Sequence, residues 1–307
     1  MYINPDTPTL LKAKEVFLVE MSKFVQDRVR RLSTLKGIDV SVVECFYDIH
    51  ISDIIEDILI GKPERLIEID KDISPLIEAS SDVKKGIKHI FKYDLFVEKA
   101  STRYDAYQLA ESLNIKTCIY CNRNYTSTVF TSDGRKLTRP QFDHYFNKAT
   151  YPLLAISFYN LIPSCPVCNS SIKGTAEMNL NEYLHPYVDD EIEKIRFTYA
   201  YSSDLKSDPK VKIVAPNSLK ARNTVEAFAL EEIYGSHTSE LSDLLKTRQY
   251  FSDRYLSLLS SHLLRDVKTS KEEIYRIVFG TEYDESNFID RPFSKFKNDI
   301  LKELGII

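Results

Sequence analysis

The sequence of 307 residues predicts an α+β protein that is mainly helical, with a compact central insert between two helical regions. Apolar residues recur at helical spacing in both flanks. Glycine, the residue that tight turns use most, occurs only 8 times. The helical period disappears between about 116 and 174, where two cysteine pairs and a turn signal occur. We therefore expect three parts, with boundaries at 1–115, 116–190 and 191–307.

The N-terminal part, 1–115, has the periodicity of packed helices. Phe17, Met21 and Val25 lie four residues apart, with charged residues between them. A second run, from Val83 to Phe91, follows Ser80, a residue type that often caps a helix. The pattern favours helices that pack on one another.

The central part has β-like runs instead. The run 125–130 is followed by a turn signal, Asp133-Gly134, and then by Gln141-Phe142, which leads into Asp143 and His144. We expect a hairpin here. If Asp143 and His144 lie on one strand, their side chains point to opposite faces, and both reach one site only where the strand bends.

Helical patterning returns after Pro216. A stripe beginning at Leu241 and Leu244 continues through Tyr255 to His262 if the segment is one helix. Pro292 stands where a first helical residue is expected, ahead of another stripe that ends at Leu304.

Charge and hydropathy exclude several classes of protein. The formal net charge of −4 argues against a chain that coats nucleic acid through bulk positive charge. The N-terminus lacks the pattern of a signal peptide, and the most apolar stretch, Tyr151 to Cys165, is shorter than the roughly 18 to 20 residues of a membrane span. We expect a soluble cytoplasmic protein that does not bind membranes.

Four of the five cysteines form two C-x2-C pairs separated by 43 residues: Cys118 with Cys121, and Cys165 with Cys168. This spacing lets both sulfurs of a pair reach one tetrahedral Zn²⁺. In a reducing compartment, metal binding is favoured over disulfides, and a redox C-x-x-C needs only one pair. We predict a structural zinc site that encloses a folded segment.

That segment contains Asp143-His144 and then Asn160, and the second cysteine pair continues directly into Asn169 and Lys173. This combination resembles the HNH (ββα-metal) endonuclease motif over about 116–174. The resemblance implies His144 as general base and Asn160 as the residue that orients its loop. It implies Asp143 and Asn169 as ligands of one catalytic divalent cation.

The chemistry of these residue types agrees with the implied roles. Phosphodiester hydrolysis needs a base for water and a positive charge near the phosphate. Histidine titrates near neutral pH, and the oxygens of Asp143 and Asn169 suit Mg²⁺ or Mn²⁺ better than Zn²⁺. Lys173, one helical turn after Asn169, is placed to meet a phosphate.

Charge within the segment supports contact with nucleic acid. From Cys118 to Gly174 there are six basic and two acidic residues, a formal charge of +4, which leaves −8 for the rest of the chain. We expect Arg123, Arg139 and Lys173 to contact nucleic acid. The alternative is chance clustering that also compensates the zinc-bound thiolates.

The stretches around Asp105, Cys118 and Tyr151 also resemble the nuclease component of Septu-type (PtuB-like) bacterial anti-phage systems. That resemblance implies an SMC/ABC-type ATPase partner, and the sequence itself contains no G-x-x-x-x-G-K-[ST] nucleotide-binding motif. The expected function is DNA cleavage in anti-phage defence. Two alternatives stay open: a zinc module that binds nucleic acid or protein without cutting, and a nuclease that acts on RNA.

Overall fold

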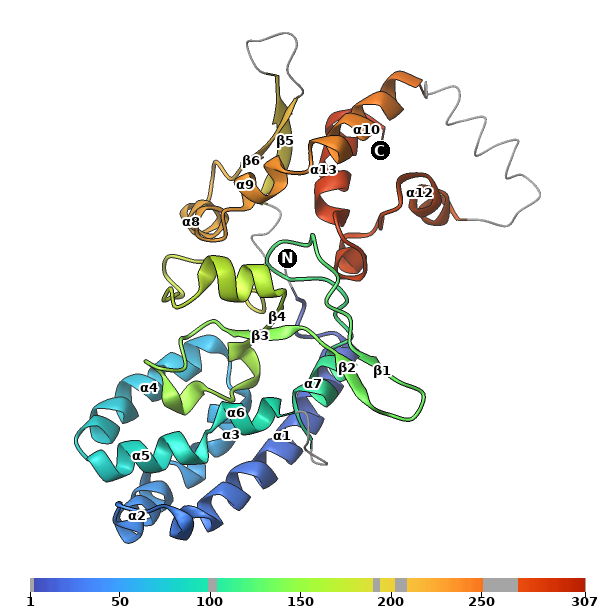
Figure 1. Cartoon of the computed structure of the whole chain (residues 1–307). Coiled ribbons are helices and arrows are strands. Elements are labelled where there is room, and N and C mark those ends of the chain that lie inside the picture. The colour runs from blue at the N-terminus through green and yellow to red at the C-terminus, as the bar shows by residue number, and fades with distance from the viewer. Residues whose placement is uncertain (1–2, 99–103, 190–193, 202–208, 251–269, 307) are drawn as a thin grey trace.

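The computed structural model describes residues 3–98, 104–189, 194–201, 209–250 and 270–306. It confirms the predicted fold class, mainly helical with small antiparallel sheets. Figure 1 shows the paired strands β3 and β4 between the N-terminal helices and the elements of the C-terminal part. The division into domains stays a prediction.

The N-terminal part is helical, as predicted. The helices are α1 (Pro8–Arg30), α2 (Val40–His50), α3 (Ile55–Ile60), α4 (Pro63–Glu78), α5 (Ser81–Ile90), α6 (Tyr93–Val97) and α7 (Ala106–Leu113). Thr7 caps α1 by accepting from the backbone N–H of Leu10, and Pro8 begins the helix. Ser80 caps α5 in the same way, which confirms the predicted capping position.

Helix α7 begins with a capping box. The Asp105 side chain accepts from the backbone N–H of Tyr107, and the Gln108 side chain accepts from the backbone N–H of Asp105. The Asp105 carboxylate also pairs with Lys136. This ion pair joins the helix to the first hairpin of the central part.

The first hairpin pairs β1 (Val129–Phe130) with β2 (Lys136–Thr138). The predicted Asp133-Gly134 turn is confirmed, with Gly134 at φ +83°. The strand that follows the turn is β2 and not the predicted run at Gln141, which begins a different strand.

The second hairpin pairs β3 (Gln141–His144) with β4 (Leu161–Ser164). A π-helix, Val167–Lys173, follows β4 directly. Two antiparallel strands and a helical turn thus carry Asp143, His144, Asn169 and Lys173. Short 3-10 helices, Pro152–Leu154 and Phe158–Asn160, lie in the connection between the two strands.

The C-terminal part begins with a third hairpin. Its elements are β5 (Arg196–Ala200), β6 (Lys210–Val214), α8 (Leu219–Ala227), α9 (Leu230–Gly235), α10 (Thr238–Tyr250), α12 (Lys271–Phe279), the 3-10 helix Glu285–Asp290 and α13 (Ser294–Glu303). Leu241 and Leu244 of the predicted stripe are buried on α10. The rest of that stripe, Tyr255 to His262, lies outside the described residues.

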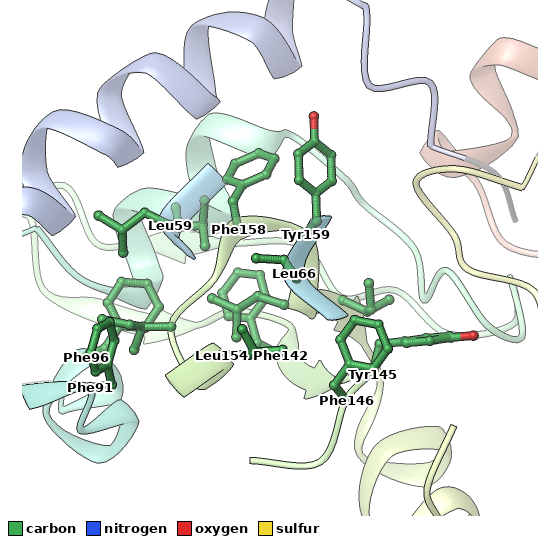
Figure 2. Packing of buried hydrophobic residues seen from close by; sticks show 14 of the residues in the cluster. Leu59, Leu66, Phe91, Phe96, Phe142, Tyr145, Phe146, Leu154, Phe158 and Tyr159 are labelled. Carbon is green, nitrogen blue, oxygen red and sulfur yellow. The ribbon is translucent and has the colours of Figure 1, made fainter. Parts of the chain in front are cut away.

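The main hydrophobic core extends over the N-terminal helices and the central part. Figure 2 shows side chains of α3, α4 and α6, and Phe91 directly after α5, packed with those of the segment 142–159. Phe17 of α1 contacts both Phe96 and Phe158, with ring centroids 6.3 and 5.4 Å apart. The N-terminal helices therefore pack against the β3–β4 hairpin and the loop that joins its two strands. Among the described helices, none is long and apolar enough to cross a membrane.

Candidate active site and metal centre

The four paired cysteines come together at one buried point. The sulfur atoms of Cys118, Cys121, Cys165 and Cys168 all lie within 4.8 Å of one another, and those of Cys121 and Cys165 are 4.0 Å apart. A tetrahedral ion bound at about 2.3 Å requires sulfurs about 3.8 Å apart. None of these cysteines forms a disulfide. The cluster can therefore hold a metal ion such as zinc.

Electrostatics favour a cation at this point. Burial raises the pKa of the Cys118 thiol well above its usual value. Four thiolates in a buried cluster repel one another, and a divalent cation removes this penalty. Zn²⁺ would be held by all four sulfurs, which leaves no coordination position for a substrate.

The C-terminal part holds the first cysteine pair in place. Asn122, which follows Cys121, has a left-handed backbone (φ +46°) and donates through its side chain to the carbonyls of Phe288 and Arg291. The Tyr234 hydroxyl donates to the carbonyl of Cys121 over 2.6 Å. These bonds therefore connect the first cysteine pair to segments more than 100 residues further along the chain.

Beside the cysteine cluster, a cleft of about 380 Å³ opens over the end of β3. Side chains of β3, of the π-helix, of α6 and of the loops on either side of β3 line it. They include Tyr93, Arg139, Asp143, His144, Lys148, Asn169 and Lys173. Asp143 and His144 are adjacent at the end of the strand and both line this cleft, as a shared site requires.

His144 is held in the form that a general base needs. Its Nε2 lies 2.8 Å from the carbonyl oxygen of Ala155, and only an Nε2–H can bond to that oxygen, so Nδ1 carries the lone pair. Burial lowers the pKa of His144 to about 4, against a smaller opposite effect of the Ala155 bond. The ring of Tyr93 packs edge-on against it, 4.4 Å between centroids. The imidazole is therefore neutral near pH 7.

Asn160 ties together the loop that contacts His144. It is fully buried, and its Oδ1 accepts from the Phe146 amide over 2.7 Å. Its Nδ2 donates to the carbonyls of Phe146 (3.1 Å) and Leu154 (2.8 Å). Because Leu154 precedes Ala155, Asn160 positions the carbonyl that accepts from His144.

Asp143 lies in a buried cluster with Lys173 and Tyr120. The Lys173 ammonium is 2.9 and 2.8 Å from the two carboxylate oxygens, and the Tyr120 hydroxyl donates to Oδ2 over 2.6 Å. The side chains of Lys173 and Asp143 are only 2% and 3% exposed. Lys173 therefore pairs with Asp143 in this structure, although its place in the sequence predicted a contact with phosphate.

This arrangement does not fit a divalent cation at Asp143. Both carboxylate oxygens already accept from Lys173, and one of them also accepts from Tyr120. Asn169, the other expected ligand, donates from its Nδ2 to Gln141 over 2.8 Å and reaches the same cleft. A cation at Asp143 would meet the ammonium of Lys173 at close range.

Two basic side chains stand at the cleft besides Lys173. Arg139 lies over the rings of Tyr107 and Phe142, at 5.4 and 5.8 Å. Lys148 lies 4.8 Å from the ring of Tyr93 and pairs with Asp94 at the surface.

Arg123, the third expected nucleic-acid contact, lies elsewhere. Its Nη1 is 3.3 Å from His237, on the side of the C-terminal part, and it does not line the cleft. The structure thus brings Arg139 to the candidate site and leaves Arg123 outside it.

Three residues of the site were not predicted as site residues: Tyr93, Tyr120 and Lys148. Lys148 was counted only among the six basic residues of the segment. Tyr120 stands between the two cysteines of the first pair, and that position is the one local signal that pointed to it. Tyr93 comes from a helix about 50 residues before His144, and only the tertiary structure brings the two rings together.

Comparison with known proteins gives one partial similarity. The chain is 35% identical over 81 residues to the Septu protein PtuB of Bacillus thuringiensis. The match covers 26% of this chain and 31% of that protein. No family model matches the chain, and no solved structure matches it.

Proposed function

We propose that this protein hydrolyses phosphodiester bonds of DNA, as an HNH-type endonuclease. The observation that carries the proposal is His144, which is neutral, has Nδ1 as its basic atom and lines a cleft with Arg139 and Lys148. The buried cysteine cluster and the β3–β4–helix order agree with the ββα-metal resemblance.

In the proposed reaction, Nδ1 of His144 takes a proton from a water molecule as the water oxygen attacks phosphorus. The new P–O bond forms while the bond to the leaving sugar oxygen breaks, and that oxygen takes a proton from solvent. Arg139 and Lys148 offer positive charge to the phosphate oxygens. Asp143 and Asn169 would hold Mg²⁺ or Mn²⁺ only after Lys173 has left the Asp143 carboxylate, and no step is assigned to that cation. Zn²⁺ is proposed as structural.

The test is cleavage of supercoiled plasmid and labelled oligonucleotides with Mg²⁺, with Mn²⁺ and with EDTA. His144→Ala is expected to lower the rate by about 10²- to 10⁴-fold, the usual contribution of a general base. His50→Ala is the matched control, because His50 lies on α2 and outside the cleft. Equal cleavage by wild type and His144→Ala would exclude His144 as the base. RNA of the same sequence, assayed in parallel, identifies the substrate class.

A non-cleaving binding module is the second candidate, and the Lys173–Asp143 pair favours it, because this pair occupies the carboxylate that a catalytic cation would need. This candidate predicts gel-shift binding that survives both His144→Ala and Asp143→Ala. It also predicts that no divalent-dependent product forms under any condition.

The partial similarity to a Septu protein supports a role in anti-phage defence. We propose an SMC/ABC-type ATPase as partner, encoded beside this chain. Co-expression with a neighbouring ATPase and co-purification tests the complex. Phage plating with and without His144→Ala tests whether protection depends on the cleft.

A further inference from the structure

The buried ion pair in the cleft has a consequence for cation binding. We propose that Lys173 and a divalent cation are mutually exclusive partners of Asp143, so that Lys173 determines the cation affinity of the site. This inference rests on the proposed function only in taking Asp143 as the residue that a cation would bind.

All the hydrogen-bonding capacity of the Lys173 ammonium is used inside the protein. It donates to both oxygens of Asp143, at 2.9 and 2.8 Å, and to the carbonyl oxygen of His144. An ammonium has three N–H donors, and these three acceptors satisfy them. The Lys173 side chain is thus fixed in one position and is buried from solvent.

Both oxygens of the Asp143 carboxylate are also hydrogen-bonded. Asp143 accepts from Lys173 through both oxygens and from the Tyr120 hydroxyl through Oδ2. Mg²⁺ binds a carboxylate oxygen at about 2.0 to 2.1 Å, which puts it within a few ångströms of the ammonium. Two positive groups at that distance, in a buried site, repel each other strongly. Cation binding therefore requires Lys173 to leave.

A cleft lies next to Lys173 into which a displaced ammonium would move. Lys173 is the last residue of the π-helix, and Gly174 after it has φ +53°, with the Ser170 carbonyl oxygen 3.9 Å from the position that a Cβ would take. The cleft of about 380 Å³ borders both residues. A phosphate of a bound nucleic acid is the anion that would accept the displaced ammonium.

The same geometry distinguishes Lys173 from Lys148. Both line the cleft, but Lys148 is at the surface, where it pairs with Asp94 at 3.3 Å and lies over Tyr93. Removing Lys148 subtracts the same charge from the cleft and leaves the carboxylate of Asp143 in its pair. Lys148 is therefore a matched control for a general effect of charge.

The experiment measures Mn²⁺ binding to the full chain by electron paramagnetic resonance, without nucleic acid. The zinc content is measured in each sample and is required to be unchanged. Lys173→Met is expected to bind Mn²⁺ at least about 10-fold more tightly than wild type, and Lys148→Met to change the affinity by less than about 3-fold. Adding Asp143→Asn to Lys173→Met is expected to abolish the tight site. Lys173→Gln replaces Lys173→Met if the latter does not fold.

A second measurement uses the wild-type protein. A buried lysine ammonium with three acceptors exchanges its protons slowly enough to give an NMR signal, and this signal is expected to disappear as Mg²⁺ saturates the site. Equal Mn²⁺ affinity of wild type and the Lys173 variants would overturn the inference, as would a lysine signal that persists at saturating Mg²⁺. Because no cleavage is measured, a failed nuclease assay would not affect either outcome.

Discussion

Replacing Asn160 by alanine tests how the loop beside His144 is held. Asn160 is fully buried and makes three hydrogen bonds to the backbone, one to the Phe146 amide and two to the carbonyls of Phe146 and Leu154. Each is worth about 1 kcal/mol net, and a buried group left unpaired costs more. We expect Asn160→Ala to lower the free energy of unfolding by about 3 to 5 kcal/mol.

The assay is urea unfolding followed by circular dichroism. With an m-value of about 3 kcal/mol/M, the midpoint is expected to fall by at least about 1 M. Asn147→Ala is the matched control on the same loop, because its side-chain bonds to Thr175 and Ala149 are exposed. We expect that control to cost less than about 1 kcal/mol. Equal midpoints for the two variants, at unchanged m-values, would refute the conclusion that the hydrogen bonds of Asn160 hold this loop in place.

Three further predictions concern pH, metal and charge. Burial lowers the pKa of His144 from 6.5 to about 4 and that of His185 from 6.5 to about 3. Between pH 4 and pH 6.5 the unfolded chain therefore binds more protons than the folded chain, so the melting temperature is expected to fall from pH 7 to pH 5. A melting temperature that does not change over this range would contradict the prediction. Cys165→Ser is expected to release zinc and lower the melting temperature by about 10 °C or more, measured by metal analysis and calorimetry. In DNA binding, the slope of the logarithm of the binding constant against the logarithm of the salt concentration is expected to fall in magnitude by about one in Lys148→Ala and to stay unchanged in Arg123→Ala. A slope that changes in Arg123→Ala and not in Lys148→Ala would place the nucleic acid outside the cleft.

The sequence was informative wherever the chemistry depends on local spacing. Two residues between cysteines allow both sulfurs of a pair to face one ion, and the structure brings both pairs to one point. The periodicity of Phe17, Met21 and Val25 identified the buried face of α1, since these three residues are fully buried there. Asp143 and His144 are consecutive in the sequence, so they necessarily lie near each other.

Spacing was a poorer guide to strand pairing. The Asp133-Gly134 turn was correctly predicted, but β2 was not, because a strand of three mostly exposed residues has no apolar alternation. Gln141–His144 pairs with β4, about 20 residues further along the chain, and only packing against the core determines that partner.

By itself, the sequence determined the helical flanks, the cysteine cluster and the presence of an imidazole beside a carboxylate. The tertiary structure decided what each charged side chain pairs with: Lys173 with Asp143, Arg123 with His237, and Lys148 with Asp94. A long, flexible basic side chain binds whichever acceptor the fold brings within reach, and that acceptor lies 30 residues away for Lys173 and more than 100 for Arg123. Backbone spacing over a few residues carries no information about such partners, so the partners of the basic side chains at the cleft follow from the fold.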